Sequence, residues 1–383
     1  MKKIILVLLL IVCSYSCNFD SSSKKSTLEI STTEKPGLKH ADGFEIRHFK
    51  ALDLLEITNP WPKADKTYKY ALLTKENAAK TTLNKDEFDA IITVPIQSIV
   101  VTSTTHIPAL ELLGVEQTLI GFPGTNYISS EKTRTRIDNG SVRELGKNEG
   151  INTEVLLELR PDVVVAFGVD GTNKSMETIE KAGITVIYNG DWVEKSPLAK
   201  AEWIKFFGAL YDKENEARML FNQIEEDYSE AKSIAAKATS KPTVLCGAMY
   251  KDVWYLPNGT SSEAQFLHDA NVNYLWSDTK ETGSIALSFE TVFDKAKDAK
   301  FWLSPSYYTS YHALEKANSH YTQFEAFQNK NIFTFSNTTG KTGGVTYYEL
   351  GTARPDLVLK DMIKICHPEL LPHYKTTFFK PLD

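Results

Sequence analysis

Short motifs that bind phosphate, metal or an acyl group are the obvious places for chemistry in this chain. The fragment TTGKTGG (338–344) contains Gly340-Lys341-Thr342, but the earlier glycine of a phosphate loop would have to replace Phe335. None of the eight histidines forms an i, i+3 or i, i+4 pair, so no helical metal site is indicated. Neither a G-x-G-x-x-G after a predicted strand nor a G-x-S-x-G is present. These absences leave an enzyme without a named nucleophile or base, and we expect no catalytic residue, cofactor or metal site.

Two cysteines, Cys246 and Cys366, belong to the part of the chain that we expect to fold, and no C-x-x-C is present. Neither a zinc cluster nor a disulfide scaffold is therefore indicated. A single disulfide and two buried free thiols both remain open.

The elements that would position functional residues alternate between short apolar strands and helices, which predicts parallel sheets covered by helices. The predicted strands are SIVVTS (98–103), TLIG (118–121), VVVAFG (163–168), ITVIY (184–188), PTVLCGAM (242–249), Asp298–Leu303 and NIFTFS (331–336). The predicted helices are Ile107–Leu113, Thr153–Arg160, Lys174–Ala182, Ser262–Ala270, Phe289–Ala296, Tyr321–Asn329 and Asp356–Cys366. Before them, residues 44–94 read as a small antiparallel hairpin region.

A strong helix signal lies at Ser196–Leu210, SPLAKAEWIKFFGAL. Ser196 can cap the helix, and the next residue is a proline that suits its first turn. The apolar residues Trp203, Phe206, Phe207 and Leu210 then fall on one face. We expect this helix to join two lobes and a second helix to follow from Asp212, although an ordinary crossover helix is the alternative.

Two segments on either side of this helix share one order of features. Asn152 and Ser288 are cap residues, each followed two positions later by a glutamate, Glu154 or Glu290. A short amphipathic helix, an aspartate and a buried strand follow in both. We therefore expect an α/β fold with two related Rossmann-like lobes that contain parallel sheets.

The N-terminus reads as an export signal. Residues 1–17 contain Lys2 and Lys3, an apolar run from Ile4 to Val12, and Cys17 after small residues. The run is too short to span a membrane, and its end resembles a bacterial lipoprotein processing site that would make Cys17 the lipidated first residue. Cys13 is a poorer alternative, and an uncleaved anchor is another. Residues 18–40 are polar and are expected to form a flexible tether.

The composition and net charge limit the class of protein and of partner. The 383 residues are 42% hydrophobic and 24% charged, which is ordinary for a globular protein of about two domains. The net charge of -6 argues against a nucleic-acid partner.

Longer stretches resemble the periplasmic substrate-binding proteins for iron-siderophore, haem and vitamin B12 import through ABC transporters. The matching stretches are SIVVTSTTHIPALELLGVEQTLIGF, IDNGSVRELG, NTEVLLELRPDVVVAFG, WYLPNGTSSEAQFLHDANVNYLW, LSFETVFDKAKDAKFWL and YYELGTARPDLVLKDMIKICHPEL. The resemblance covers about residues 95–370 and implies two α/β lobes joined by one long helix, with the ligand between them. We expect an N-terminal lobe at 41–195, an interlobe helix at 196–211 and a C-terminal lobe at 212–383.

The resemblance implies that the loops after the strands of both lobes face the ligand, since open α/β sheets bind ligands beyond the carboxyl ends of their strands. Tyrosine and tryptophan dominate these loops and suit a flat or aromatic ligand. Arg134 and Arg136 could bind an anionic ligand or be solvated loop charges. His106 could ligate the metal of haem or cobalamin or serve as a hydrogen-bond partner at a helix start. The expected ligand-binding residues are Thr104, Thr105, His106, Tyr127, Arg134, Arg136, Phe167, Trp192, Tyr250, Trp254, Tyr255, Tyr307, Tyr308 and Tyr347.

The resulting prediction is a lipid-anchored, non-enzymatic, monomeric protein at the periplasmic face of a bacterial membrane. It would capture a ferric siderophore and deliver it to an ABC permease dimer, with cobalamin or haem as alternative ligands. The rival from another class is an exported hydrolase or lyase. The resemblance also implies that Glu154 and Glu290 meet arginines of the two permease subunits, although a carboxylate in a first helical turn also favours the helix dipole without any partner.

Overall fold

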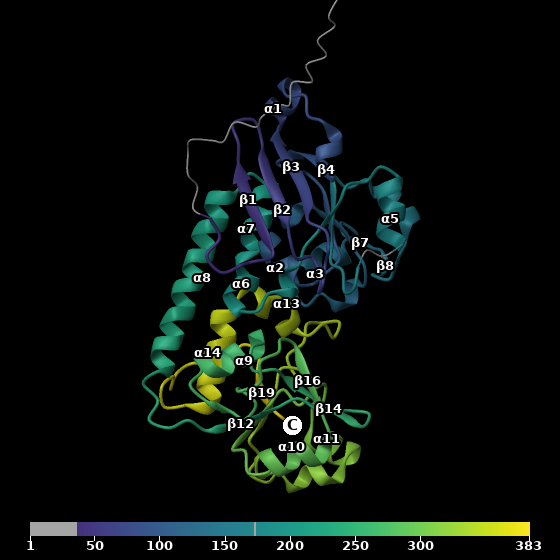
Figure 1. The fold of residues 1–383 in the computed structure, drawn as a ribbon. Coiled ribbons are helices and arrows are strands. Elements are labelled where there is room, and N and C mark those ends of the chain that lie inside the picture. Colours follow the sequence, from purple (N-terminus) through teal and green to yellow (C-terminus); the bar gives the residue numbers. More distant parts are fainter. Residues whose placement is uncertain (1–36, 172–173) are drawn as a thin grey trace, which may run out of the picture.

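The computed structural model describes residues 37–171 and 174–383. The expected signal peptide, Cys17 and most of the expected tether lie outside the described residues. Figure 1 shows an N-lobe, purple to teal, above a C-lobe, green to yellow, with the helix α8 (Glu214–Ala235) running alongside both. Parallel sheets in both lobes confirm the predicted α/β class.

The N-lobe is organised around a five-stranded sheet of order β11-β10-β5-β6-β7, all parallel. Its strands are β5 (Ile99–Val101), β6 (Leu119–Phe122), β7 (Arg143–Glu144), β10 (Val163–Ala166) and β11 (Val186–Tyr188). Its helices are α2 (His106–Leu112), α3 (Glu131–Asp138), α4 (Thr153–Leu159) and α5 (Lys174–Lys181), and a small ladder joins β8 (Gly146–Lys147) to β9 (Gly150–Ile151). All of β10 is buried, as expected for a central parallel strand covered on both faces.

A second N-lobe sheet has the order β1-β2-β3-β4. Its strands are β1 (Phe44–His48), β2 (Asp53–Ile57), β3 (Tyr68–Thr74) and β4 (Ala90–Val94). The first three strands are antiparallel as predicted, but β4 runs parallel to β3. The helix α1 (Lys75–Lys80) and a short 3-10 turn carry the chain back along the sheet before β4, so this connection is a crossover and not a hairpin.

The C-lobe contains a five-stranded sheet of order β15-β12-β17-β18-β19 and a three-stranded sheet of order β13-β14-β16. The strands are β12 (Thr243–Cys246), β13 (Ala248–Tyr250), β14 (Val253–Pro257), β15 (Asn273–Tyr274), β16 (Ser284–Leu287), β17 (Phe301–Leu303), β18 (Ile332–Thr334) and β19 (Lys380–Pro381). The helices are α9 (Ser262–Asp269), α10 (Phe289–Ala296), α11 (Tyr311–Ala317), α12 (Glu325–Gln328), α13 (Thr346–Ala353) and α14 (Pro355–Cys366). Cys246 and Cys366 are buried free thiols, so the disulfide alternative is wrong.

The two lobes share one topology, as the internal repeat predicted. With the short edge strands β7 and β19 left out, the four remaining strands of each main sheet lie side by side in the chain order second, first, third and fourth, as β6-β5-β10-β11 and β15-β12-β17-β18. The matching helices α4 and α10 each precede the third of these four strands, β10 or β17. Asn152 and Ser288 cap these helices by accepting the backbone N–H groups of Val155 and Thr291.

The predicted interlobe helix is not continuous. Ser196 caps it and Pro197 begins it as expected, but the segment divides at Trp203 into α6 (Pro197–Glu202) and α7 (Ile204–Leu210). Every residue of α7 is buried, and α7 belongs to the N-lobe core, whereas α6 also packs on α9, α13 and α14 of the C-lobe.

The long continuous helix that contributes buried residues to both cores is α8. Its first half contributes Ala217, Phe221 and Ile224 to the N-lobe core. Its second half contributes Tyr228, Ala231 and Ala235 to the C-lobe core. At ~1.5 Å per residue, a helix of 22 residues is roughly 33 Å long, enough to reach from one core to the other.

The folded part of the chain also includes the last residues of the expected tether, 18–40. The Glu202 carboxylate accepts the backbone N–H groups of Lys39, His40 and Ala41 at 2.7–3.1 Å. It also accepts a hydrogen bond from Lys205 Nζ at 2.5 Å. The chain is therefore attached to the N-lobe from Lys39 onward.

Candidate functional site

The two lobes meet at the carboxyl ends of their parallel strands. The loop after β18 contacts the loop after β6, because Thr342 Oγ1 donates to the Asn126 carbonyl at 2.8 Å. The helix α13, which follows the same C-lobe loop, packs on α2 and α6 of the N-lobe. We call the strand-end loops of both lobes the interlobe face. It holds residues 102–105, 123–130, 167–170 and 189–193 of the N-lobe and residues 247–255, 304–308 and 335–348 of the C-lobe.

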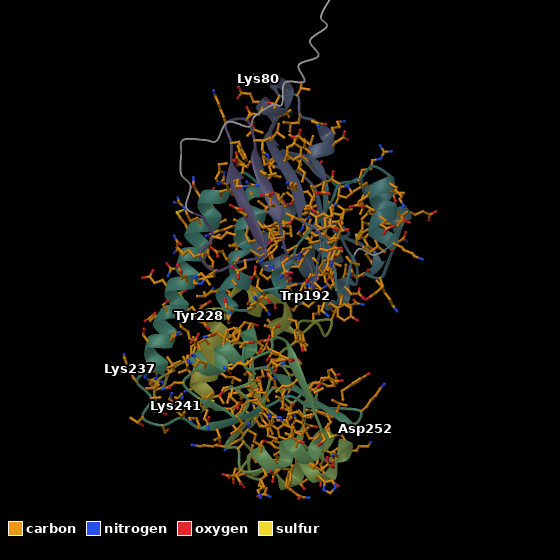
Figure 2. All side chains as sticks on the ribbon, in the orientation of Figure 1. Lys80, Trp192, Tyr228, Lys237, Lys241 and Asp252 are labelled. Atoms are coloured by element: carbon orange, nitrogen blue, oxygen red, sulfur yellow. The ribbon has the colours of Figure 1, made fainter. Side chains whose placement is uncertain are left out.

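Exposed aromatic side chains from both lobes gather in these loops. In the N-lobe, Tyr127 is 72% exposed and Trp192 is 37% exposed. Trp192 Nε1 donates to the Gly168 carbonyl at 3.1 Å, which fixes the indole against the neighbouring loop. Figure 2 labels Trp192 on the side of the N-lobe that faces the C-lobe.

The C-lobe contributes exposed aromatics from its hairpin and from the loop after β17. Tyr250 and Tyr255 lie on the paired strands β13 and β14, and both are exposed. Lys251 Nζ lies 5.5 Å from the centre of the Tyr250 ring, within cation–π range. Tyr307 is 70% exposed in the loop after β17. Asp252, labelled in Figure 2, marks the tip of the hairpin.

Trp254 does not belong with these aromatics, which corrects one prediction. Successive side chains of a strand point to opposite faces, so Trp254 and Tyr255 cannot face the same ligand. Trp254 is fully buried, with its ring centre 5.4 Å from that of Trp302 and 5.6 Å from that of Tyr321. Its Nε1 donates to the Cys246 carbonyl at 3.0 Å. It is a core residue of the C-lobe.

His106 is also a core residue, which corrects a second prediction. It is fully buried at the start of α2, and its ring centre lies 5.5 Å from that of Phe207. Burial holds the pKa of His106 below 6.5 and outweighs the nearby Asp191 carboxylate and Asn189 amide, which raise it. The imidazole is therefore not presented to a ligand at the interlobe face.

The two arginines lie on the helix α3, capped by Ser130, and not in a loop. Arg134 is buried, and its Nη1 donates to the Thr125 carbonyl at 2.7 Å. Arg136 Nη2 donates to the carbonyls of Gln117 and Leu119, at the amino end of β6 and so at the opposite edge of the sheet. Both guanidinium groups bind backbone carbonyls of their own lobe, which corrects the prediction that they bind an anionic ligand.

The remaining predicted residues are partly buried at the interlobe face. Thr104 and Thr105 directly precede α2, Phe167 follows β10, and Tyr308 follows β17. Tyr347 lies in α13, where it stacks on Phe335 with ring centres 4.2 Å apart and an interplanar angle of 4°. Burial raises the pKa of the Tyr347 hydroxyl well above 10.

Tyr348 was missed. Its side chain is 56% exposed, and its ring centre lies 5.2 Å from that of Phe335. The segment TYYELGTA has no clear apolar period, so the sequence does not predict α13 and indicates a loop that ends at Tyr347. The adjacent tyrosines were the available signal.

Glu154 and Glu290 take equivalent positions in the two lobes. Each is exposed, and each is the second helical residue after its cap. Hydrogen bonds from its own backbone N–H and then from the Ser288 hydroxyl lower the pKa of the Glu290 carboxyl. The two carboxylates are available for contacts outside the chain.

Within the described ranges, one group of side chains has the composition of a metal site. The ligand atoms of His48, Asp53 and Glu214 lie within 4.8 Å of one another. His48 Nδ1 lies 2.6 Å from the Asp53 carboxylate and His48 Nε2 lies 4.0 Å from the Glu214 carboxylate, so the three side chains already contact one another. They belong to β1, β2 and the start of α8, outside the interlobe face.

In the part of the chain that the structure covers, no helix combines the length and apolarity needed to cross a membrane. A lipoprotein of Methanocaldococcus jannaschii is 28% identical over 385 residues, which is 94% of this chain and 89% of that relative. A second lipoprotein of the same organism is 23% identical over 290 residues, covering 73% of this chain and 72% of that one.

Solved structures show the same fold. A possible iron-binding, periplasmic solute-binding protein of Staphylococcus epidermidis is 17% identical, with a TM-score of 0.56 over 71% of this chain and 99% of that one. The triscatecholate siderophore-binding protein FeuA of Bacillus subtilis is 17% identical, with a TM-score of 0.53 over 71% of this chain and 94% of that one. The family model described as periplasmic binding protein matches residues 99–339, which span both lobes and α8. The chain therefore belongs to the periplasmic binding protein family.

Proposed function

We propose that this protein binds a ferric siderophore between its lobes and delivers it to an ABC permease. The observation that carries the proposal is the gathering of exposed aromatic side chains at the carboxyl ends of strands from both lobes. They are Tyr127, Trp192, Tyr250, Tyr255, Tyr307 and Tyr348. Aromatic rings offer large rigid apolar areas with polar tips, which suits an organic chelate around a metal. The name of the Bacillus subtilis neighbour, a siderophore-binding protein complexed with ferri-bacillibactin, supports this ligand class.

The two arginines of α3 do not favour a strongly anionic chelate. Arg134 and Arg136 donate to backbone carbonyls within the N-lobe and are not presented to a ligand. A highly anionic tricatecholate would need such forked donors, whereas a ferric trihydroxamate carries little net charge. Because the metal in such a complex is already fully coordinated, the buried position of His106 is no obstacle.

Cobalamin and haem are the alternative ligands. A Vibrio cholerae neighbour is a periplasmic haem-binding protein, 17% identical with a TM-score of 0.52 over 69% of this chain and 99% of that one. Because His106 is buried and is not presented to haem iron, we rank haem behind the siderophore. An exported enzyme is the rival of another class, and turnover of a substrate would support it.

The remaining parts of the proposal concern delivery. Cys17 would carry the lipid anchor at the periplasmic face of the membrane, and the monomer would dock on the permease dimer through Glu154 and Glu290. Their equivalent exposed positions in two lobes of one topology support a pseudo-symmetric contact with two permease subunits.

The test combines ligand identification with a binding panel. Native mass spectrometry of protein purified from its own host would reveal a carried ligand by its mass. Quenching of tryptophan fluorescence by ferrioxamine B, ferric enterobactin, haemin and cyanocobalamin would then rank the classes. We expect one-to-one binding of the trihydroxamate complex without product formation. Tighter binding of haemin or cyanocobalamin, or turnover of any compound, would overturn the siderophore proposal.

A further inference from the structure

A buried carboxylate joins the two lobes. Glu349 lies on α13 of the C-lobe and is 2% exposed. It accepts the backbone N–H groups of Ser129 and Ser130 of the N-lobe at 2.5 and 2.9 Å. A carboxylate that bridges two peptide N–H groups fixes both the distance and the direction of the contact, because each oxygen takes one donor.

The TTGKTGG segment makes a second set of contacts beside this carboxylate. Arg134 Nη1 and Thr342 Oγ1 lie 3.4 Å apart, and Thr342 donates in turn to the Asn126 carbonyl. Lys341 Nζ lies 3.2 Å from the Asp138 carboxylate. All three contacts cross from the C-lobe to the N-lobe.

The glycines of this segment allow the two backbones to touch. A Cβ atom on Gly340 would lie 2.6 Å from Ser129 Cα, and one on Gly344 would lie 2.1 Å from the Tyr127 carbonyl oxygen. Both distances are shorter than a side chain can tolerate. The glycine-rich composition that resembles a phosphate loop is therefore explained by close packing between the lobes.

Hydrogen bonds within the N-lobe stabilise the backbone segment that contacts Glu349. Thr133 Oγ1 donates to Glu111 Oε1 at 2.6 Å, and Ser130 Oγ donates to the same oxygen. Ser130 also caps α3 by accepting the Thr133 N–H. The two N–H groups that meet Glu349 are therefore held in place by the first turn of α3.

We propose that Glu349 and residues 338–344 form an interlobe latch that positions Tyr127 of the N-lobe relative to Tyr347 and Tyr348 of the C-lobe. Glu349 directly follows the two C-lobe tyrosines, and Ser129 lies two residues after Tyr127. The latch thus holds aromatic side chains of both lobes in one arrangement before ligand arrives. A site ordered in advance binds more tightly, because binding does not have to restrict the lobes. The positioning role rests on the proposed function, whereas the latch itself does not.

The latch can be tested without ligand by hydrogen–deuterium exchange on the full chain. In Glu349→Ala, we expect faster exchange in residues 124–130 and 338–345, with little change in α10 at the far end of the C-lobe. Glu349→Gln should be intermediate, since its amide oxygen still accepts a hydrogen bond. Gly344→Val should reproduce the effect without touching the carboxylate, and Glu315→Gln, on the exposed face of α11, is the matched control. Unchanged exchange at Ser129 and Ser130 in a folded Glu349→Ala protein would overturn the latch.

The positioning role is tested by stopped-flow binding of ferrioxamine B, followed through tryptophan fluorescence. We expect about a tenfold loss of affinity in Glu349→Ala and Gly344→Val, with partial rescue in Glu349→Gln. Faster exchange with unchanged binding rates would overturn the positioning role and leave a purely structural latch. If the wild type binds none of the panel, the proposed function fails, while the exchange experiment still decides the latch.

Discussion

The sharpest prediction concerns the neighbours Trp254 and Tyr255, which the strand β14 sends to opposite faces. Trp254 is fully buried among the rings of Trp302, Tyr321 and Phe324, whereas Tyr255 is 44% exposed. Replacing a buried tryptophan by alanine typically costs about 3–5 kcal/mol, because the cavity is added to the lost apolar burial. An exposed tyrosine should cost under about 0.5 kcal/mol on replacement.

The assay is a pair of single substitutions measured for both stability and binding. Trp254→Ala should lower the melting temperature by roughly 10 °C for a lobe of this size, with Trp254→Phe recovering much of the loss. Tyr255→Ala should leave the melting temperature nearly unchanged and weaken ferrioxamine B binding by about 1 kcal/mol or more if it contacts the ligand. Equal stability losses at the two positions would refute the assignment of opposite faces. Normal binding by a folded Tyr255→Ala protein would remove Tyr255 from the ligand site.

Three further predictions follow from single groups. Because the folded-state pKa of His106 lies below its ordinary 6.5, the unfolded chain takes up the proton first. The contribution of neutral His106 to the unfolding free energy is present above pH 6.5 and is lost as the pH falls toward the folded-state pKa. A His106→Gln variant should therefore lose less unfolding free energy than the wild type between pH 7 and 5, as measured by urea titration. Glu154→Lys and Glu290→Lys together should leave ligand affinity unchanged and nearly abolish uptake, with each single change partly masked by high salt; normal uptake by the folded double mutant would leave both as helix-end charges. Cys17→Ser should move the protein from the membrane to the soluble fraction, and a mutant that stays with the membrane would refute lipidation there.

The sequence predicted the parallel sheets because buried parallel strands can be recognised as uninterrupted apolar runs. Val163–Ala166 is such a run, and every residue of it is buried. The repeat predicted the shared topology because capping residues are local signals: Asn152 and Ser288 cap helices in the structure as their side chains suggested. Local chemistry decides these features, so a single sequence is enough to find them.

Features that depend on contacts between residues far apart in the sequence could not be predicted as well. The apolar pattern at Ser196–Leu210 indicates a buried helix but cannot tell which helix reaches both cores, and the structure gives that role to α8. Position in a strand-end loop does not reveal side-chain direction, so Trp254 and Tyr255 looked equivalent. Arg134 reads as a free charge until the Thr125 carbonyl is seen beside it.

The sharing of α8 between the two cores has a consequence for the internal duplication. The N-lobe core takes Ala217, Phe221 and Ile224 from a helix that continues into the C-lobe. A chain that stops after α7 would leave the N-lobe with an uncovered apolar surface, although its sheets would be complete. On the ribosome, the N-lobe cannot finish folding until the first half of α8 has emerged. The two halves of the chain are therefore copies in topology but not self-sufficient units, and recombination with a relative would succeed only where the crossover keeps α8 with both of its cores.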